Sequence, residues 1–137
     1  MPRFVLLEHD HPFLHWDLML ENGDTLQTWR LDSVPSGAAV ISAEPLPDHR
    51  IAYLDYEGPV SRDRGTVKRV DAGEFTSGNS ALAARSPHVV EIQLAGTQLR
   101  GTARICNDSG TLEWQPSSTD QAPSSPQAPS IRQLRAD

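Results

Sequence analysis

The chain has 137 residues, a formal net charge of -6 and one cysteine. This length fits one domain with its own core and is too short for two domains of ordinary size. A single cysteine excludes an internal disulfide, and the N-terminus lacks the long apolar run of a signal peptide or membrane span, so we expect a cytoplasmic protein. The acidic balance argues against extended contact with a nucleic-acid backbone, but it leaves room for a small phosphate pocket.

Short segments rich in Val, Leu, Ile, Thr and Trp recur along the chain, separated by Gly, Pro, Asn and Asp. This rhythm is typical of an all-β protein. The predicted strands are residues 3–9, 15–21, 25–31, 38–43, 51–57, 65–70, 88–94, 99–106 and 111–115. Because open sheets expose edges that pair with other chains, we predict a small closed or partly closed β-barrel of about eight to nine mostly antiparallel strands.

Turn and tail signals set the boundaries of this domain. Asn22-Gly23-Asp24 predicts a hairpin turn, because Asn and Gly tolerate the positive φ that such turns need. Residues 73–86 give no clear pattern and stay unassigned. Residues 116–137 are mostly Ser, Pro, Ala, Gln, Thr and Asp, which bury too little apolar surface to offset the entropy of ordering. We therefore predict a β-barrel domain over residues 1–115 and a disordered tail over residues 116–137.

The run from Glu8 to Asp17 places three imidazoles and three carboxylates within ten residues. On a strand, residues two apart share a face, so His15 and Asp17 point the same way, and Trp16 points to the packed side. If the residues between His9 and His15 form a hairpin loop, these two histidines lie almost opposite each other. Two imidazoles and a carboxylate suit Mn²⁺, Zn²⁺ or Fe²⁺ and leave coordination positions for water or substrate. His11 lies inside the predicted turn and is expected to face solvent.

A second polar cluster contains His49 and Tyr53, with His49 leading into the strand predicted over residues 51–57. An imidazole can protonate a leaving alkoxide or donate to a phosphate oxygen, and a tyrosine hydroxyl can also donate. These two residues are therefore candidates for phosphate binding and acid catalysis.

Together these residues resemble a known family, the 3'-phosphoesterase domain of bacterial DNA ligase D. The resemblance covers roughly residues 3–115, and its most specific element is the His-x(5)-His-x-Asp spacing. The matching residues are Phe4-Val5, His9-Asp10, His15-x-Asp17, Leu26-x-x-Trp29, Asp48-His49, Tyr53, Glu57-Gly58, Gly65-Thr66-Val67 and Leu99-x-Gly101.

The resemblance implies a function and a role for each site residue. It implies that His9, His15 and Asp17 hold Mn²⁺, that His49 and Tyr53 contact the reactive phosphate, and that the protein removes a 3'-terminal ribonucleoside and then a 3'-phosphate. In one respect the sequence departs from the family, which carries a phosphate-gripping arginine two residues after the metal-binding aspartate. Here that residue is Met19, and a thioether cannot replace the charged, often bidentate contacts of a guanidinium.

Three interpretations follow. The first is an active Mn²⁺-dependent phosphoesterase that heals 3' ends of DNA in repair, as a monomer and without membrane contact. The second is a catalytically weakened relative that keeps the metal and acts as a binding module, with its tail docking on a DNA-repair protein. The third takes His15, Asp17 and His49 as the facial triad of a non-haem iron oxygenase.

Overall fold

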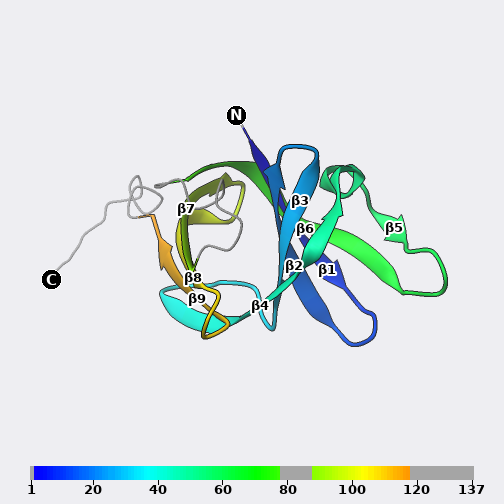
Figure 1. Ribbon diagram of the computed structural model, residues 1–137, viewed down its shortest axis with the longest axis horizontal. Coiled ribbons are helices and arrows are strands. Elements are labelled where there is room, and N and C mark those ends of the chain that lie inside the picture. Colours follow the sequence, from blue (N-terminus) through cyan, green and yellow to red (C-terminus); the bar gives the residue numbers. More distant parts are fainter. Residues whose placement is uncertain (1, 78–87, 118–137) are drawn as a thin grey trace, which may run out of the picture.

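The computed structural model describes residues 2–77 and 88–117, which form nine β-strands and one 3-10 helix (Figure 1). The strands are β1 (Arg3–His9), β2 (His15–Asn22), β3 (Thr25–Leu31), β4 (Ala39–Arg50), β5 (Gly58–Pro59), β6 (Thr66–Ser77), β7 (Val89–Gly96), β8 (Arg100–Cys106) and β9 (Thr111–Pro116), and the helix is η1 (Ile51–Leu54). Every strand pairing in this part of the chain is antiparallel. It contains no helix with the length and hydropathy of a membrane span.

Eight of the strands close into a ring of hydrogen bonds. Their order is β1-β2-β3-β4-β9-β8-β7-β6, and β6 pairs with β1 to complete the circuit. β5 lies outside the ring, paired with the beginning of β6. The predicted all-β, closed and antiparallel fold is therefore confirmed.

Two long strands connect the two halves of the molecule. β4 pairs with β9 over Ala39–Ser42 and then with β3 from Ala43 onward. β6 pairs with β1 along most of its length and with β7 over Gly73–Ser77. Figure 1 shows the result, with β7, β8 and β9 on the left, β1, β2 and β3 in the middle, and η1 and β5 on the right.

The apolar residues form two clusters on opposite faces of β1, β2 and β3. The larger cluster fills the ring, because all eight ring strands contribute to it: Phe4, Leu18, Trp29, Ala43, Phe75, Val90, Ala103 and Leu112 are examples. The smaller cluster lies on the outer face and contains Val5, Leu7, Met19, Leu26, Leu54 and Val67. β1 is buried on both faces, which explains why Phe4 to Leu7 is an unbroken apolar run.

The two-residue turn between β2 and β3 fixes the register of the central hairpin. Gly23 has a φ of 68°, the left-handed conformation that favours glycine, and Asn22 pairs with Thr25 across the turn. The predicted hairpin is confirmed. Its register places Asp17 opposite Arg30 and Met19 opposite Thr28.

Three predicted boundaries need correction. The strand predicted over residues 51–57 is wrong, because Ile51–Leu54 forms η1 and places Leu54 on the outer apolar cluster. The strand predicted over 38–43 continues as β4 to Arg50, and the strand predicted over 65–70 continues as β6 to Ser77. The unassigned residues 78–86 and most of the predicted tail, 118–137, lie outside the described residues.

Candidate metal centre

Three potential metal ligands converge where β1 ends and β2 begins. His9 pairs directly with His15, and Asp17 lies two residues further along the same face of β2. One ligand atom from each residue lies within 4.8 Å of the others. His15 and Asp17 are each only 2% exposed, so the structure brings the three predicted metal ligands together in a largely buried position.

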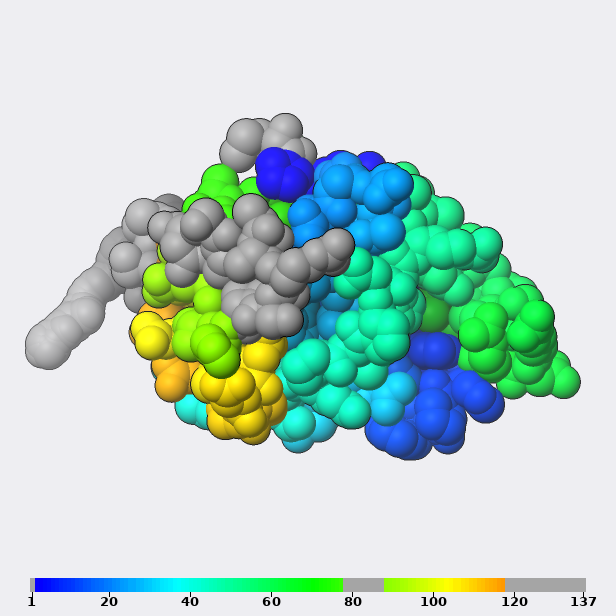
Figure 2. All heavy atoms as spheres, in the orientation of Figure 1, coloured from blue at the N-terminus to red at the C-terminus, as the bar shows by residue number. Residues whose placement is uncertain are grey.

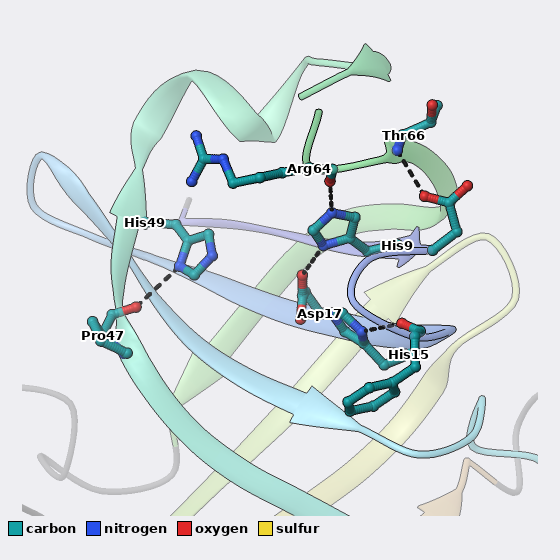
Figure 3. Close-up of polar contacts among 9 residues, drawn as sticks. His9, His15, Asp17, Pro47, His49, Arg64 and Thr66 are labelled. Carbon is teal, nitrogen blue, oxygen red and sulfur yellow. Dashed lines mark hydrogen bonds and ion pairs between the residues drawn. The ribbon is translucent and has the colours of Figure 1, made fainter. Parts of the chain in front are cut away.

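Backbone carbonyls orient both imidazoles. His9 Nε2 donates to the carbonyl of Arg64 at 2.7 Å, and His15 Nδ1 donates to the carbonyl of Phe13 at 2.8 Å (Figure 3). A carbonyl can only accept. When the rings are neutral, these bonds therefore place the proton on Nε2 of His9 and on Nδ1 of His15. The opposite nitrogens, His9 Nδ1 and His15 Nε2, then turn their lone pairs toward Asp17, at 3.6 Å and 3.3 Å from its carboxylate oxygens.

This arrangement fits a cation. Asp17 Oδ1 is buried and has no hydrogen-bond partner among the described residues. With neutral imidazoles, three lone-pair donors face one another with no proton between them, an arrangement that costs free energy unless a positive charge compensates. Histidine ligands to metals usually donate their other ring N–H to a carbonyl or carboxylate, as His9 and His15 do here. The residues present can therefore hold a divalent metal ion.

The loop between β5 and β6 supports the site from the side. Asp10 accepts a hydrogen bond from the backbone N–H of Thr66 at 2.8 Å, which ties the β1–β2 loop to the start of β6. Gly65 has a φ of 78°, and a Cβ there would lie 2.3 Å from the Asp10 carboxylate and 2.6 Å from His11. Only glycine fits this approach, and it lets the Arg64 carbonyl reach His9.

The candidate metal centre opens into a pocket of about 640 Å³. The pocket lies on the outer face of the ring, where the β1–β2 loop, the end of β4 with η1, and the β5–β6 loop meet, and Figure 2 shows the surface hollowed there. Pockets of this size accommodate ligands as large as a nucleotide. The outer apolar cluster, through Met19 and Val67, forms part of its floor.

His49 and Tyr53 line the same pocket, so the structure brings the two predicted phosphate-contacting residues to the metal centre. His49 lies near the end of β4 and leads into η1, which corrects its expected position before a strand. Its Nδ1 donates to the carbonyl of Pro47 at 3.0 Å, so Nε2 is the nitrogen left for a ligand. The rings of His49 and Tyr53 lie 6.0 Å apart, and Figure 3 shows His49 across the pocket from His9.

The structure also bears on three other predictions, those for His11, for the iron-oxygenase triad and for Met19. His11 lines the pocket but does not belong to the group of three ligands, and its half-buried position differs from the expected solvent-facing one. The metal-binding group found among the described residues contains His9 and not His49, which argues against the iron-oxygenase triad. Met19 is 1% exposed and offers no donor to an anion.

The pocket is locally basic although the protein is acidic. It is lined by four arginines, Arg30, Arg50, Arg62 and Arg64, against two aspartates, Asp17 and Asp48. Sequence analysis missed Arg30, yet the signal was present. A two-residue turn at Gly23-Asp24 dictates that Arg30 lies opposite Asp17, and the strand period then places both side chains on one face.

The strands form a closed ring, and the site places a carboxylate between two histidines beside a basic pocket. Such a fold and site suit metal-dependent chemistry on phosphate esters. Residues 7–107 match the sequence model of the family described as the DNA ligase D 3'-phosphoesterase domain. The chain therefore belongs to this family, and membership implies processing of 3' ends in DNA repair. No curated protein matches the chain.

Proposed function

We propose that this protein is a divalent-metal-dependent 3'-phosphoesterase that removes a 3'-phosphate or a terminal 3'-ribonucleoside from DNA during repair. The observation that carries the proposal is the buried Asp17 carboxylate in a basic pocket: each of its oxygens faces one imidazole lone pair, and Oδ1 has no hydrogen-bond partner among the described residues. His9, His15 and Asp17 would hold the metal. Mn²⁺ is the expected ion, and Zn²⁺ and Fe²⁺ suit the same donors.

The metal, when bound, would neutralise phosphate charge and lower the pKa of a coordinated water. The chain supplies the remaining functions. The hydroxyl of Tyr53 lines the pocket and can donate to phosphate oxygens, and so can Nε2 of His49 when the ring is an imidazolium. The basic lining attracts a dianionic phosphate end, while the net charge of -6 discourages extended contact with duplex DNA.

The reaction needs one proton transfer to the leaving group. Water forms a bond to phosphorus and releases one proton to solvent, the bond from phosphorus to the 3' oxygen breaks, and that oxygen takes a proton to become a 3'-hydroxyl. The imidazolium form of His49 is proposed to supply this proton from Nε2 and to regain it from solvent, because Nδ1 is bonded to Pro47 and the ring lies on the side of the pocket opposite His9. Tyr53, whose ring contacts that of His49, would hold the phosphate in line.

The test is release of phosphate, or of a 3'-ribonucleoside, from a DNA primer by metal-stripped protein with and without Mn²⁺. Release that depends on Mn²⁺ and is lost in His15→Ala supports the proposal. Arg104→Ala is the matched control, because Arg104 is exposed on β8 and does not line the pocket. Absence of release with every metal tested would contradict it.

A second function is favoured by one observation, the buried Met19 at the position where the resemblance places a phosphate-binding arginine. A protein that keeps the metal without this arginine could act as a binding module in repair. Mn²⁺ binding with no turnover, together with retention of a 3'-phosphorylated primer, would favour that module over the enzyme.

The wider setting is also proposed. A monomeric, cytoplasmic protein whose partner is a DNA 3' end fits the single cysteine, the charge and the pocket. The Ser- and Pro-rich residues after the domain would be the segment that contacts a repair protein.

A further inference from the structure

Arg30 occupies a special position beside the metal centre. It lies directly opposite Asp17 in the β2–β3 pairing, and both side chains line the pocket. Directly opposed residues on one face of an antiparallel pair have Cβ atoms about 5 Å apart. The guanidinium of Arg30 is therefore attached next to the carboxylate that would bind the metal.

The hydrogen-bonding capacity of Arg30 is largely unused. Its Nε is buried and has no hydrogen-bond partner among the described residues, although the side chain as a whole is 28% exposed. Its single ion pair there is a long contact of 3.9 Å from Nη1 to Glu44, which is itself well exposed. The side chain therefore keeps guanidinium donors available for an anionic ligand that enters the pocket.

The aromatic ring of Phe13 packs against the guanidinium of Arg30. Arg30 Cζ lies 5.2 Å from the ring centroid of Phe13, and the same ring contacts His15 at 5.5 Å between centroids. The guanidinium and one metal ligand thus pack against one aromatic ring. This contact keeps the planar group at the metal side of the pocket.

The other arginines of the pocket are less well suited. Arg64 donates from Nε and Nη2 to the carbonyl and hydroxyl of Ser61, so its fork is already occupied. Arg62 lies in the β5–β6 loop with a φ of 62°, and Arg50 lies at the exposed end of β4. Arg30 alone among the four belongs to the β2–β3 hairpin that carries Asp17.

We propose that Arg30 is the phosphate-binding arginine of this protein and that it takes over from β3 the role that Met19 cannot perform on β2. The ligand class is a terminal phosphate monoester or diester, bound by the guanidinium of Arg30. This inference rests on the proposed function for the identity of the substrate. It requires only a phosphate group for its direct test.

The direct test is binding of inorganic phosphate to the Mn²⁺-loaded protein, measured by calorimetry beside a separate Mn²⁺ titration. In Arg30→Ala we expect phosphate affinity to fall about ten- to a hundredfold, with Mn²⁺ affinity unchanged. Arg30→Lys should recover only part of the loss, because a single ammonium cannot reproduce the planar fork. Arg104→Ala should match the wild type.

The same variants then separate the two proposals in kinetic assays of primer dephosphorylation. A loss of kcat/KM in Arg30→Ala similar to the loss of phosphate affinity supports the inference. Equal kcat/KM in Arg30→Ala and active wild type would overturn the role of Arg30 and leave the enzyme proposal standing. Loss of Mn²⁺ binding in both Arg30 variants would also overturn it, because Arg30 would then act through Asp17. An inactive wild type that binds phosphate through Arg30 would contradict the enzyme proposal alone.

Discussion

Asp17 and Asp71 are both almost completely buried, but the protein surrounds the two carboxylates in opposite ways. Asp71 on β6 accepts hydrogen bonds from three backbone N–H groups of the β7–β8 hairpin, those of Thr97, Gln98 and Leu99, at 2.7 to 3.0 Å. Asp17 receives no hydrogen bond at Oδ1 and faces two imidazole lone pairs. Backbone donors of the fold thus compensate the Asp71 carboxylate, whereas a metal ion bound from solution could compensate the Asp17 carboxylate.

The largest effect is expected from replacing Asp17 or the histidines that face it. Asp17→Asn should lower Mn²⁺-dependent phosphate release at least about a hundredfold, because even residues that only support a metal ligand cost ten- to a hundredfold when replaced. His9→Ala should behave in the same way. Calorimetric Mn²⁺ titrations and the primer assay measure both. Unchanged Mn²⁺ affinity in these two variants would show that the metal site lies elsewhere.

Replacing Asp71 should instead lower the stability of the folded protein. Asp71→Ala leaves three backbone donors of the β7–β8 hairpin without their acceptor, and we expect a loss of about 2–3 kcal/mol in the free energy of unfolding. Urea denaturation of the metal-free protein measures it. The folded fraction should still bind Mn²⁺ with wild-type affinity, since Asp71 does not line the pocket. A stable Asp71→Ala protein would contradict this account of the hairpin.

The two aspartates should also differ in their effect on the stability gained from metal binding. A ligand that binds only the folded state adds RT ln(1 + [L]/Kd), or about 1.4 kcal/mol at ten times Kd. Wild type and Asp71→Ala should both gain this increment with Mn²⁺, and Asp17→Asn should gain none. Thermal unfolding with and without the ion measures the difference. An equal gain in all three proteins would point to metal binding away from Asp17.

The smallest effect concerns a third carboxylate, Asp55, which is exposed and pairs with Arg3 at 2.6 Å. The hydrogen bond from Arg3 lowers the pKa of Asp55, so the pair adds stability at neutral pH. This contribution declines as the pH falls below about 4, where the carboxylate takes up a proton. Asp55→Asn should lower the unfolding midpoint slightly at pH 7 and not at pH 2. High salt should also shrink the difference, because exposed pairs are screened.

Much of the fold could be predicted because its signals are local. The first strand follows from an unbroken apolar run and the second from alternating Trp16, Leu18 and Leu20, and a two-residue turn at Gly23-Asp24 fixes the register of β2 with β3. The error after residue 43 also has a physical cause. Pro45 and Pro47 indicate a loop, yet β4 accommodates them because this part of it pairs with β3 alone, leaving its other edge free of ladder bonds.

The metal ligands were predictable for the same local reason, since His9, His15 and Asp17 belong to one hairpin. The pocket was not, because its walls come from distant segments. Residues 51–54 form a short apolar run like that of a strand, but Leu54 packs in the outer apolar cluster with Val5 and Leu7, and the segment forms a 3-10 turn that covers the outer face. The sequence by itself determined the ligand set, the hairpin register and the strand rhythm. Only the tertiary structure decided that four arginines, His49 and Tyr53 line one pocket with Asp17, because the ring must close before those loops can meet.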